Sequence, residues 1–576
     1  MRWTNIQLCK IFIFLWLWVG ISDVLLAQES SFWRNNDIET FSTGGSLSFT
    51  ASAYTVDGIE NRRAPGMIQT NANLNFTVLG LSSGIGINYS TDESGLRQNM
   101  NTFHYNAGWR WLVLQVGDMN TRFSSYGLSG ATVRGGYIRA TPGDFLVELI
   151  GGRSKRAVRP SIETGFREPA FEQWSYGAKV GYGRSRRSYF FLSSFYSRDS
   201  RTSLNGTNLD IDPRENLTLT PDFQVRFWDG RITIASEATA SVFTNNLNSS
   251  TISFDDLPIP GFLGAFYTPR SSSRINYAGN ANIDFVFDMF SLGMGYERIQ
   301  PGFESLGSGR IRDDIEKVSM SPTIRFLDNR VSVSTNISHS RDNLLGNRFQ
   351  TQQNTGAGAN IQYTISENLS LNTSYNLILN RVKPDSDDDF AGFGQTQTSH
   401  NLMLMPNLVI MAEEITHNIS ITAGYLTIAS KFDGEGSELQ DEFLSQSYTG
   451  GASYSITLPS GLTLSKNSTY MRNDSDDLEI NNYGLNLGAS YALFDRTLTL
   501  SLNSGLSMNR TERAGFDGET ISTRLQQING ASTASYRLTS NDTFSLNIRT
   551  RNNRVLEGSG RAFTELEGRF QYQRRF

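Results

Sequence analysis

The sequence predicts an all-β protein: a single transmembrane antiparallel β-barrel of about 26 strands, or 24 if two weakly marked hairpins are absent. Three observations predict this fold. Side chains alternate with a period of two along most of the chain, the alternating segments run about 10 to 14 residues, and short turns alternate with long polar connections. Strands of soluble proteins average about 5 to 6 residues, whereas a tilted membrane strand needs about 9 to 11. A soluble β-sandwich is therefore the weaker alternative.

The composition agrees with this class. Only 38% of the 576 residues are hydrophobic and the mean hydropathy is -0.35. A bundle of membrane helices is excluded, because each helix needs roughly 20 consecutive apolar residues, whereas a barrel strand exposes only alternate residues to lipid. The formal net charge of -5 comes without a basic stripe, so we expect no nucleic-acid partner. The one cysteine, Cys9, precedes the predicted barrel and leaves it without a disulfide.

The first residues have the layout of a secretory signal peptide. Arg2 and Lys10 flank the start of an apolar run at residues 11–21, and the small residue Ala27 follows a second short apolar stretch. The core of about 11 apolar residues is shorter than the roughly 20 that an uncleaved membrane anchor needs. We expect a signal peptide at residues 1–27, a short periplasmic segment at 28–45 and the barrel at 46–576. The segment at 28–45 leaves no room for a plug domain.

The alternation is clear in residues 369–379. One face carries Leu369, Leu371, Thr373, Tyr375, Leu377 and Leu379. The other face carries Ser370, Asn372, Ser374 and Asn376, with Ile378 as its apolar member. Residues 497–508 repeat the pattern. We expect the apolar faces to contact lipid and the Ser, Thr, Asn and Gln faces to line the lumen.

The connections between these segments alternate in length. Tight turns are predicted at residues 228–230, 327–329, 366–368, 459–461, 494–496 and 539–542, where Asp-Gly, Asp-Asn and Ser-Gly supply hairpin-turn chemistry. Long loops are predicted at residues 245–272, 383–399, 431–444 and 509–520. Short periplasmic turns and long extracellular loops are typical of transmembrane barrels, and an even strand number places both ends of the barrel on the periplasmic side. The two weakly marked hairpins lie near residues 108–110 and Met289.

The last strand carries alternating aromatic residues and ends on one: Phe570, Tyr572 and Phe576. This pattern resembles the C-terminal signature of Gram-negative outer-membrane β-barrel proteins, and the whole chain is similar in style to large Bacteroidota-type barrels. The resemblance implies an integral outer-membrane protein in contact with lipid, whose last strand closes the barrel and is read by the barrel assembly machinery. A weaker similarity to export barrels such as ushers lies in Gly117-Asp118, Leu128-Ser129-Gly130 and Arg134-Gly135.

Two segments are candidate functional sites. A predicted outer loop is basic, with Lys155 among the arginines Arg153, Arg156, Arg159 and Arg167. These side chains could form a vestibule that attracts anions or lipid phosphates, although an ordinary solvated loop is the favoured interpretation. The long loop at 245–272 is unusually apolar, with Pro258, Pro260, Phe262, Phe266 and Tyr267. It could narrow the lumen or dock a partner, or it could pack against neighbouring loops.

Nothing in the sequence indicates an enzyme. The four histidines have no metal-ligand spacing and no nucleophile motif is present, so we expect no catalytic residues, no metal and no cofactor. A barrel this wide would leak if it were empty, so we expect outer loops or a protein partner to fill or gate the lumen, or a flattened barrel. The function we expect is a porin-like channel for small polar solutes. The alternatives are a non-enzymatic component of a surface export or assembly complex, or a structural surface barrel.

Overall fold

The computed structural model describes residues 41–91, 98, 101–159, 169–184, 186–204, 211–253, 267–309, 311–384, 394–433, 443–515 and 519–576. The predicted signal peptide and most of the predicted periplasmic segment lie outside these residues, so both remain predictions, as does the absence of a plug domain. Within the described ranges, no helix has the length and apolar character that crossing a membrane requires.

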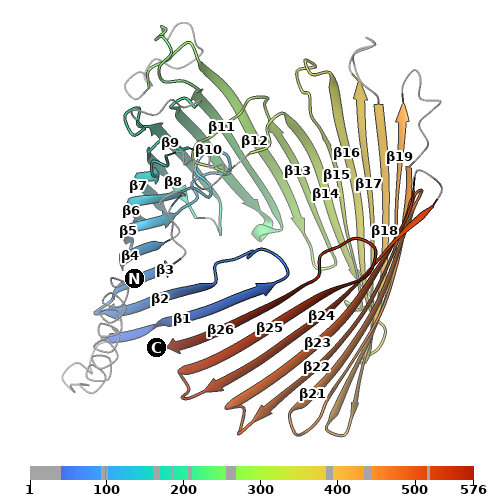
Figure 1. The fold of residues 1–576 in the computed structure, drawn as a ribbon. Coiled ribbons are helices and arrows are strands. Elements are labelled where there is room, and N and C mark those ends of the chain that lie inside the picture. The colour runs from blue at the N-terminus through green and yellow to red at the C-terminus, as the bar shows by residue number, and fades with distance from the viewer. Residues whose placement is uncertain are drawn as a thin grey trace.

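The described chain forms one closed antiparallel barrel of 26 strands. Each strand pairs with its neighbours in the sequence, and β1 pairs with β26 to close the ring (Figure 1). In this closing pair, Phe49 lies opposite Tyr572. The predicted all-β barrel is therefore confirmed. Both weakly marked hairpins exist: β4 ends at Trp109 before β5 begins at Leu112, and β12 ends at Val286 before β13 begins at Phe290.

The first half of the barrel consists of β1 (Phe41–Asp57), β2 (Gly66–Val78), β3 (Leu81–Ser90), β4 (Thr102–Trp109), β5 (Leu112–Asn120), β6 (Thr132–Ala140), β7 (Phe145–Lys155), β8 (Gln173–Gly183), β9 (Tyr189–Asp199), β10 (Glu215–Phe227), β11 (Ile232–Thr244), β12 (Ser273–Val286) and β13 (Phe290–Ile299). The second half consists of β14 (Ile315–Phe326), β15 (Val331–Arg341), β16 (Gln350–Thr364), β17 (Leu369–Pro384), β18 (Gly394–Ala412), β19 (Ile415–Asp433), β20 (Phe443–Thr457), β21 (Leu462–Ser475), β22 (Leu478–Leu493), β23 (Leu498–Ala514), β24 (Thr520–Arg537), β25 (Asp542–Glu557) and β26 (Phe563–Arg575). A short 3-10 helix, η2 (Trp228–Gly230), lies between β10 and β11.

All six predicted tight turns connect strands, and they lie at the end of the barrel where β1 begins and β26 ends. Three of them have consecutive residues with positive φ, including Asp229, Asp328 and Asp495. Such dihedrals match the right-handed twist of the flanking strands, which explains the Asp-Gly and Asp-Asn pairs seen in the sequence. The other end of the barrel, which we call the outer end, carries the longer connections.

Strand lengths differ from the prediction. They range from 8 residues in β4 to 19 in β18 and β19, whereas the sequence predicted a narrower range. The predicted loop at 383–399 shrinks because β17 continues to Pro384 and β18 begins at Gly394, and β1 begins at Phe41 rather than Ser46. Beyond the bilayer both faces of a strand meet water. Ladder hydrogen bonds can therefore continue there without any apolar alternation in the sequence.

Three prolines interrupt the ladder in the same way. Pro221, Pro322 and Pro406 each lie opposite a residue of the preceding strand, but each falls at a break in the pairing with the following strand. Proline has no backbone N–H to donate, so a break is expected on the side that the missing N–H would face. The shared position explains the repeated Pro-to-turn pattern of these hairpins.

The barrel wall separates apolar from polar side chains. Tyr375 of β17 and Leu402 of β18 lie opposite each other and are exposed on the outer face of the wall. Their sequence neighbours Asn376 and Asn401 lie opposite each other on the lumen face. The same alternation recurs around the ring, so large apolar residues cover the exterior and polar residues face the lumen. A closed barrel with an apolar exterior is suited to lipid, because closure leaves no unpaired strand edge in the membrane.

Candidate functional site

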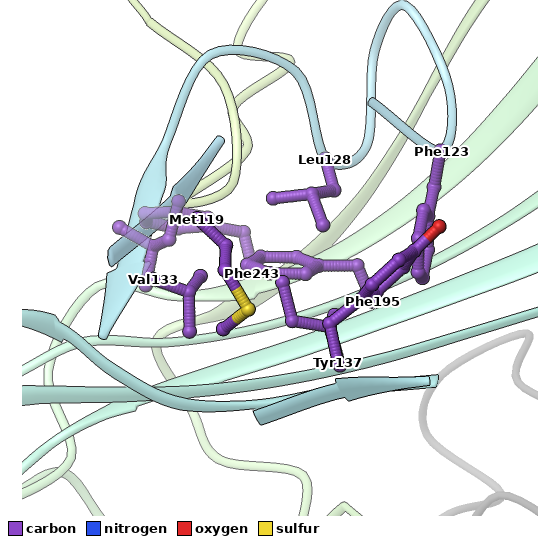
Figure 2. Packing of buried hydrophobic residues seen from close by; sticks show 9 residues of the cluster. Met119, Phe123, Leu128, Val133, Tyr137, Phe195 and Phe243 are labelled. Carbon is purple, nitrogen blue, oxygen red and sulfur yellow. The ribbon is translucent and has the colours of Figure 1, made fainter. Parts of the chain in front are cut away.

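The connection between β5 and β6, residues 121–131, packs on the lumen side of the wall; we call it the first inward connection. Its Phe123 and Leu128 are buried in a core with seven other residues (Figure 2). The others are Met119, Val133, Tyr137, Ile150, Phe195, Phe243 and Leu306. In β9 the buried Phe195 lies on the face opposite the lipid-exposed Phe190 and Leu192, which places this core inside the barrel.

Glycines shape the strands that carry this connection. Gly117 of β5, Gly135 of β6 and Gly152 of β7 are register neighbours in adjacent strands. Gly117 has a φ of +112°, and a Cβ there would lie 2.2 Å from the carbonyl oxygen of Phe103. Only glycine fits such a position. The Gly-Asp and Arg-Gly pairs noted in the sequence thus mark close backbone approaches between β4 and β5 and between β6 and β7.

Next to these glycines, Asp118 and Arg134 form a bidentate ion pair. The Arg134 guanidinium donates to both carboxylate oxygens of Asp118 at 2.7 and 2.8 Å, and it also donates to the carbonyl of Asn101 at 2.9 Å. The second carboxylate oxygen accepts the backbone N–H of Phe103 at 2.8 Å. Charge-assisted paired hydrogen bonds of this kind fix geometry strongly, so the pair ties β4, β5 and β6 together at their outer ends.

Polar groups of the wall hold the first inward connection in place. Ser125 donates its hydroxyl to Glu237 of β11 at 2.7 Å, and Tyr126 donates to Glu297 of β13 at 2.7 Å. Lys179 of β8 donates to the carbonyl of Phe123 at 2.7 Å. Burial raises the pKa of Tyr126, so its phenol stays protonated and remains a donor. Carboxylates on two strands and one lysine therefore clamp a single short connection to the lumen wall.

The connection between β13 and β14, residues 300–314, lies against the first; we call it the second inward connection. Ser129 donates its N–H to the carbonyl of Gly307 at 2.8 Å, and Ser305 donates its hydroxyl to the carbonyl of Gly127 at 2.7 Å. The Phe303 ring meets Tyr126 edge-on at 6.2 Å. The two connections therefore form one layer over the lumen faces of the wall from β5 to β13.

A cavity of about 760 Å³ lies between the outer ends of β5 to β8 and the second inward connection. Its basic lining residues are Arg134, Arg153, Lys155, Arg156 and Arg214. The residues of the predicted basic vestibule lie at different places. Arg153 and Arg156 line the cavity, Arg159 is exposed and lies outside the lining, and Arg167 lies outside the described residues. Arg214, from the connection before β10, was missed because nothing in the linear sequence relates it to β7.

The apolar loop at 245–272 gives a different result. Of its predicted site residues, the structure describes Tyr267, which is 2% exposed and packs with Leu217 and Val242. Leu217 and Val242 belong to the outward face of β10 and β11, since Glu237 and Phe243 lie on the lumen face. Tyr267 therefore covers the exterior of the barrel and does not narrow its lumen. Pro258, Pro260, Phe262 and Phe266 lie outside the described residues, so their role remains a prediction.

The C-terminal strand joins both of its neighbours. Tyr572 stacks on Phe544 of β25 with ring centroids 4.9 Å apart and donates to Asp542 at 2.7 Å. Phe570 is exposed on the lipid face, and the N–H of Phe576 donates to the carbonyl of Gly45 at 3.0 Å. The aromatic residues of the predicted signature thus lie at the seam between β25, β26 and β1.

In the described part of the chain, no three His, Cys, Asp or Glu side chains are grouped so that they could hold a metal ion. No protein-family model matches the chain. No curated protein matches it either.

Solved structures give distant matches. OccAB4 of Acinetobacter baumannii is 11% identical, with a TM-score of 0.30, over 71% of this chain and 99% of that one. The ferric enterobactin receptor PfeA of Pseudomonas aeruginosa is 10% identical, with a TM-score of 0.40, over 93% of this chain and 81% of that one. OpdK of Pseudomonas aeruginosa, solved with vanillate, is 11% identical, with a TM-score of 0.29, over 68% and 98%. Similarities this weak carry no argument about this chain, whose fold rests on its own strand pairing.

The location of the protein follows from the barrel itself. Its strands close into a ring, its exterior is apolar, and its short turns and longer connections lie at opposite ends. These are the features of a transmembrane β-barrel of the outer-membrane type, in which lipid solvates the exterior and the lumen carries the polar side chains. The chain is an integral outer-membrane β-barrel protein.

Proposed function

We propose that this protein is a porin-like channel for small polar solutes, narrowed on one side by its two inward connections. The proposal rests on a difference between two parts of the lumen wall. From β5 to β13 the wall is covered by a packed layer, while from β15 to β22 no segment that the structure describes packs on the lumen face, and its side chains are mainly polar. A polar, uncovered wall is what a water-filled pathway requires.

The uncovered wall is chemically uniform. In the described strands from β15 to β22, the positions that alternate with the lipid-facing ones are mainly Ser, Thr, Asn, Gln and Gly, and none of them is charged. β17 is typical, with Ser370, Asn372, Ser374 and Asn376 on this face. Hydroxyl and amide groups both donate and accept hydrogen bonds, so they can replace water around a passing polar solute without holding it as a fixed charge would. The wall therefore supports passage rather than retention.

The inward connections explain how so wide a barrel could remain selective. Barrels of about 16 to 18 strands already leave an aqueous channel, so an empty barrel of this strand number would pass solutes indiscriminately. Here the first inward connection is fixed by Glu237, Glu297 and Lys179, and the second lies against it. A buried apolar core beneath them makes this layer a permanent part of the wall.

Planar-bilayer recording tests the proposal. We expect the purified barrel to insert and give stable, stepwise ion currents, with single-channel conductance below that of an empty cylinder of the same circumference. The same protein, unfolded by boiling before addition, should give no steps. If the folded barrel, verified by its shifted gel mobility before heating, gave no conductance steps over many insertions, the channel proposal would be wrong.

A further inference from the structure

The described lining of the cavity at the outer ends of β5 to β8 has more basic than acidic side chains. Its acidic lining residues are already engaged. Asp118 is held by both hydrogen bonds from Arg134, Glu304 forms an ion pair with Arg274, and Asp313 accepts the N–H of Gly302. Arginines therefore pair with Asp118 and Glu304, and Asp313 is the remaining acidic side chain of the described lining. The remaining basic side chains outnumber it.

The basic side chains are less well paired. The Lys155 ammonium forms no side-chain hydrogen bond or close ion pair with a residue that the structure describes, and the carboxylate of Asp199 attracts it only at longer range. Arg153 lies 3.7 Å from Glu172, and Arg214 lies 3.9 Å from Asp199, both longer than a hydrogen bond. Three cationic groups therefore line one cavity, and two of them share the single carboxylate of Asp199. Like charges brought together in this way repel each other unless an anion lies between them.

An irregularity in the pairing of β7 with β8 determines the position of Lys155. A register shift between Arg153 and Lys155 marks a bulge in β7, and the hydroxyl of the intervening Ser154 donates to the Gln173 side chain at 3.0 Å. The bulge sets Lys155 opposite Gln173, which is 0% exposed. Bulges commonly re-aim a side chain at functional positions of a sheet.

Buried hydrogen bonds hold the backbone on which Lys155 and Arg214 lie. Gln173 of β8 donates to one carboxylate oxygen of Asp199 in β9 at 2.8 Å, and the other oxygen accepts the backbone N–H of Arg214 at 2.9 Å. The N–H of Asp199 in turn donates to the carbonyl of Arg214 at 2.9 Å. A buried network thus fixes the chain positions of both Lys155 and Arg214, and a site ordered in advance binds with a smaller entropy cost.

We propose that this cavity binds a small soluble anion that carries a carboxylate or phosphate group, held by Lys155 and Arg214 with Arg153 at its edge. The volume of about 760 Å³ lies within the usual range of small-molecule sites. The inference rests on the proposed function, since the anion would be a solute of the channel. Phosphorylated lipid shares this chemistry, but the second inward connection forms one side of the cavity, which favours a soluble anion.

Titration calorimetry on the detergent-solubilised full-length barrel tests the proposal, with inorganic phosphate and citrate as probes. We expect saturable binding of at least one of them. The double variant Lys155→Gln/Arg214→Gln should weaken it by at least about tenfold, because a charge-assisted hydrogen bond is lost at each position. Lys155→Arg should retain most of the affinity, since it keeps the charge.

Lys317→Gln is the matched control. Lys317 is an exposed lysine of β14 outside the cavity lining, so its loss removes the same charge without touching the site. Equal binding by the double variant and the wild type, or a barrel that binds phosphorylated lipid but neither soluble anion, would overturn the proposal. Because calorimetry measures occupancy, a barrel that conducts but does not bind anions refutes the site alone. One that binds but does not conduct refutes the channel alone.

Discussion

Replacing residues 122–129 with a short Gly-Ser connection should raise the single-channel conductance several-fold while the barrel stays folded. The replaced residues include Phe123 and Leu128 of the buried core and the partners of Glu237 and Glu297. Without them the second inward connection loses its contacts at Gly127 and Ser129, so both connections should leave the wall. The ring of ladder hydrogen bonds does not depend on this layer, because the connection lies outside all strands.

The matched control replaces the connection at residues 58–65 with Gly and Ser. It is also a long connection at the outer end, but its arginines pair with Glu565 and Glu567 of β26 rather than with the lumen layer. Its conductance should equal that of the wild type. An unchanged conductance in the first variant, with normal heat-shifted gel mobility, would show that the inward connections do not narrow the pathway.

Gly135→Ala should destabilise the barrel, whereas Gly136→Ala should not. A Cβ at Gly135 would lie 2.0 Å from the carbonyl oxygen of Gly151 and 2.6 Å from the Cα of Gly152, both backbone atoms of the paired strand. Neither atom can move without breaking the ladder between β6 and β7. Overpacking typically costs about 1 to 3 kcal/mol, and a rigid backbone contact places this variant at about 3 kcal/mol.

Gly136 lies next to Gly135 in the same strand, yet a Cβ there would meet nothing within 4 Å. Its alanine variant should unfold at the same urea concentration as the wild type in detergent, followed by tryptophan fluorescence. The Gly135 variant should unfold at a clearly lower concentration. Identical midpoints for the two variants would mean that the close approach of β6 and β7 is absent from the folded protein.

The barrel could be predicted because its signals are local. Alternation within residues 369–379 and the Asp-containing turn at 327–329 each depend on neighbouring residues, and each occurs many times along the chain. Such repetition makes the strand number accurate even where single hairpins are weakly marked. The strand ends were less predictable, since beyond the membrane the ladder continues through residues such as Gln395 and Gln397 that carry no apolar alternation.

The lumen layer could not be predicted, because its contacts join segments far apart in the sequence. Phe123 and Leu128 lie among Ser and Gly residues in a short connection. Apolar residues at such positions indicate that the connection packs against other parts of the protein. Their partners Phe195, Phe243 and Leu306 come from three distant segments. The sequence indicated the apolar loop at 245–272 as a candidate site instead, but its described residue Tyr267 packs on the exterior. The apolar character of a segment does not by itself indicate on which side of the wall the segment packs.

The sequence indicated only those basic residues of the cavity that are close together in the chain. Arg153, Lys155 and Arg156 are close in the sequence and line one cavity together. Arg214 joins them because pairing across β7, β8 and β9 brings the end of one connection beside the end of another strand. A linear pattern can show a local cluster of charge, but only the register of the strands shows which charges share a cavity.

The most direct test of the channel is the accessibility of single cysteines at two adjacent positions of β18. The predicted mature chain contains no cysteine, so Asn401→Cys and Leu402→Cys each introduce one thiol. Asn401 faces the lumen, whereas Leu402 is 38% exposed on the lipid face. In planar bilayers a charged, water-soluble methanethiosulfonate reagent should label the Asn401 variant and change its conductance, and should leave the Leu402 variant unchanged. Failure to label Asn401→Cys, or an equal effect on both variants, would contradict a water-filled lumen in this barrel.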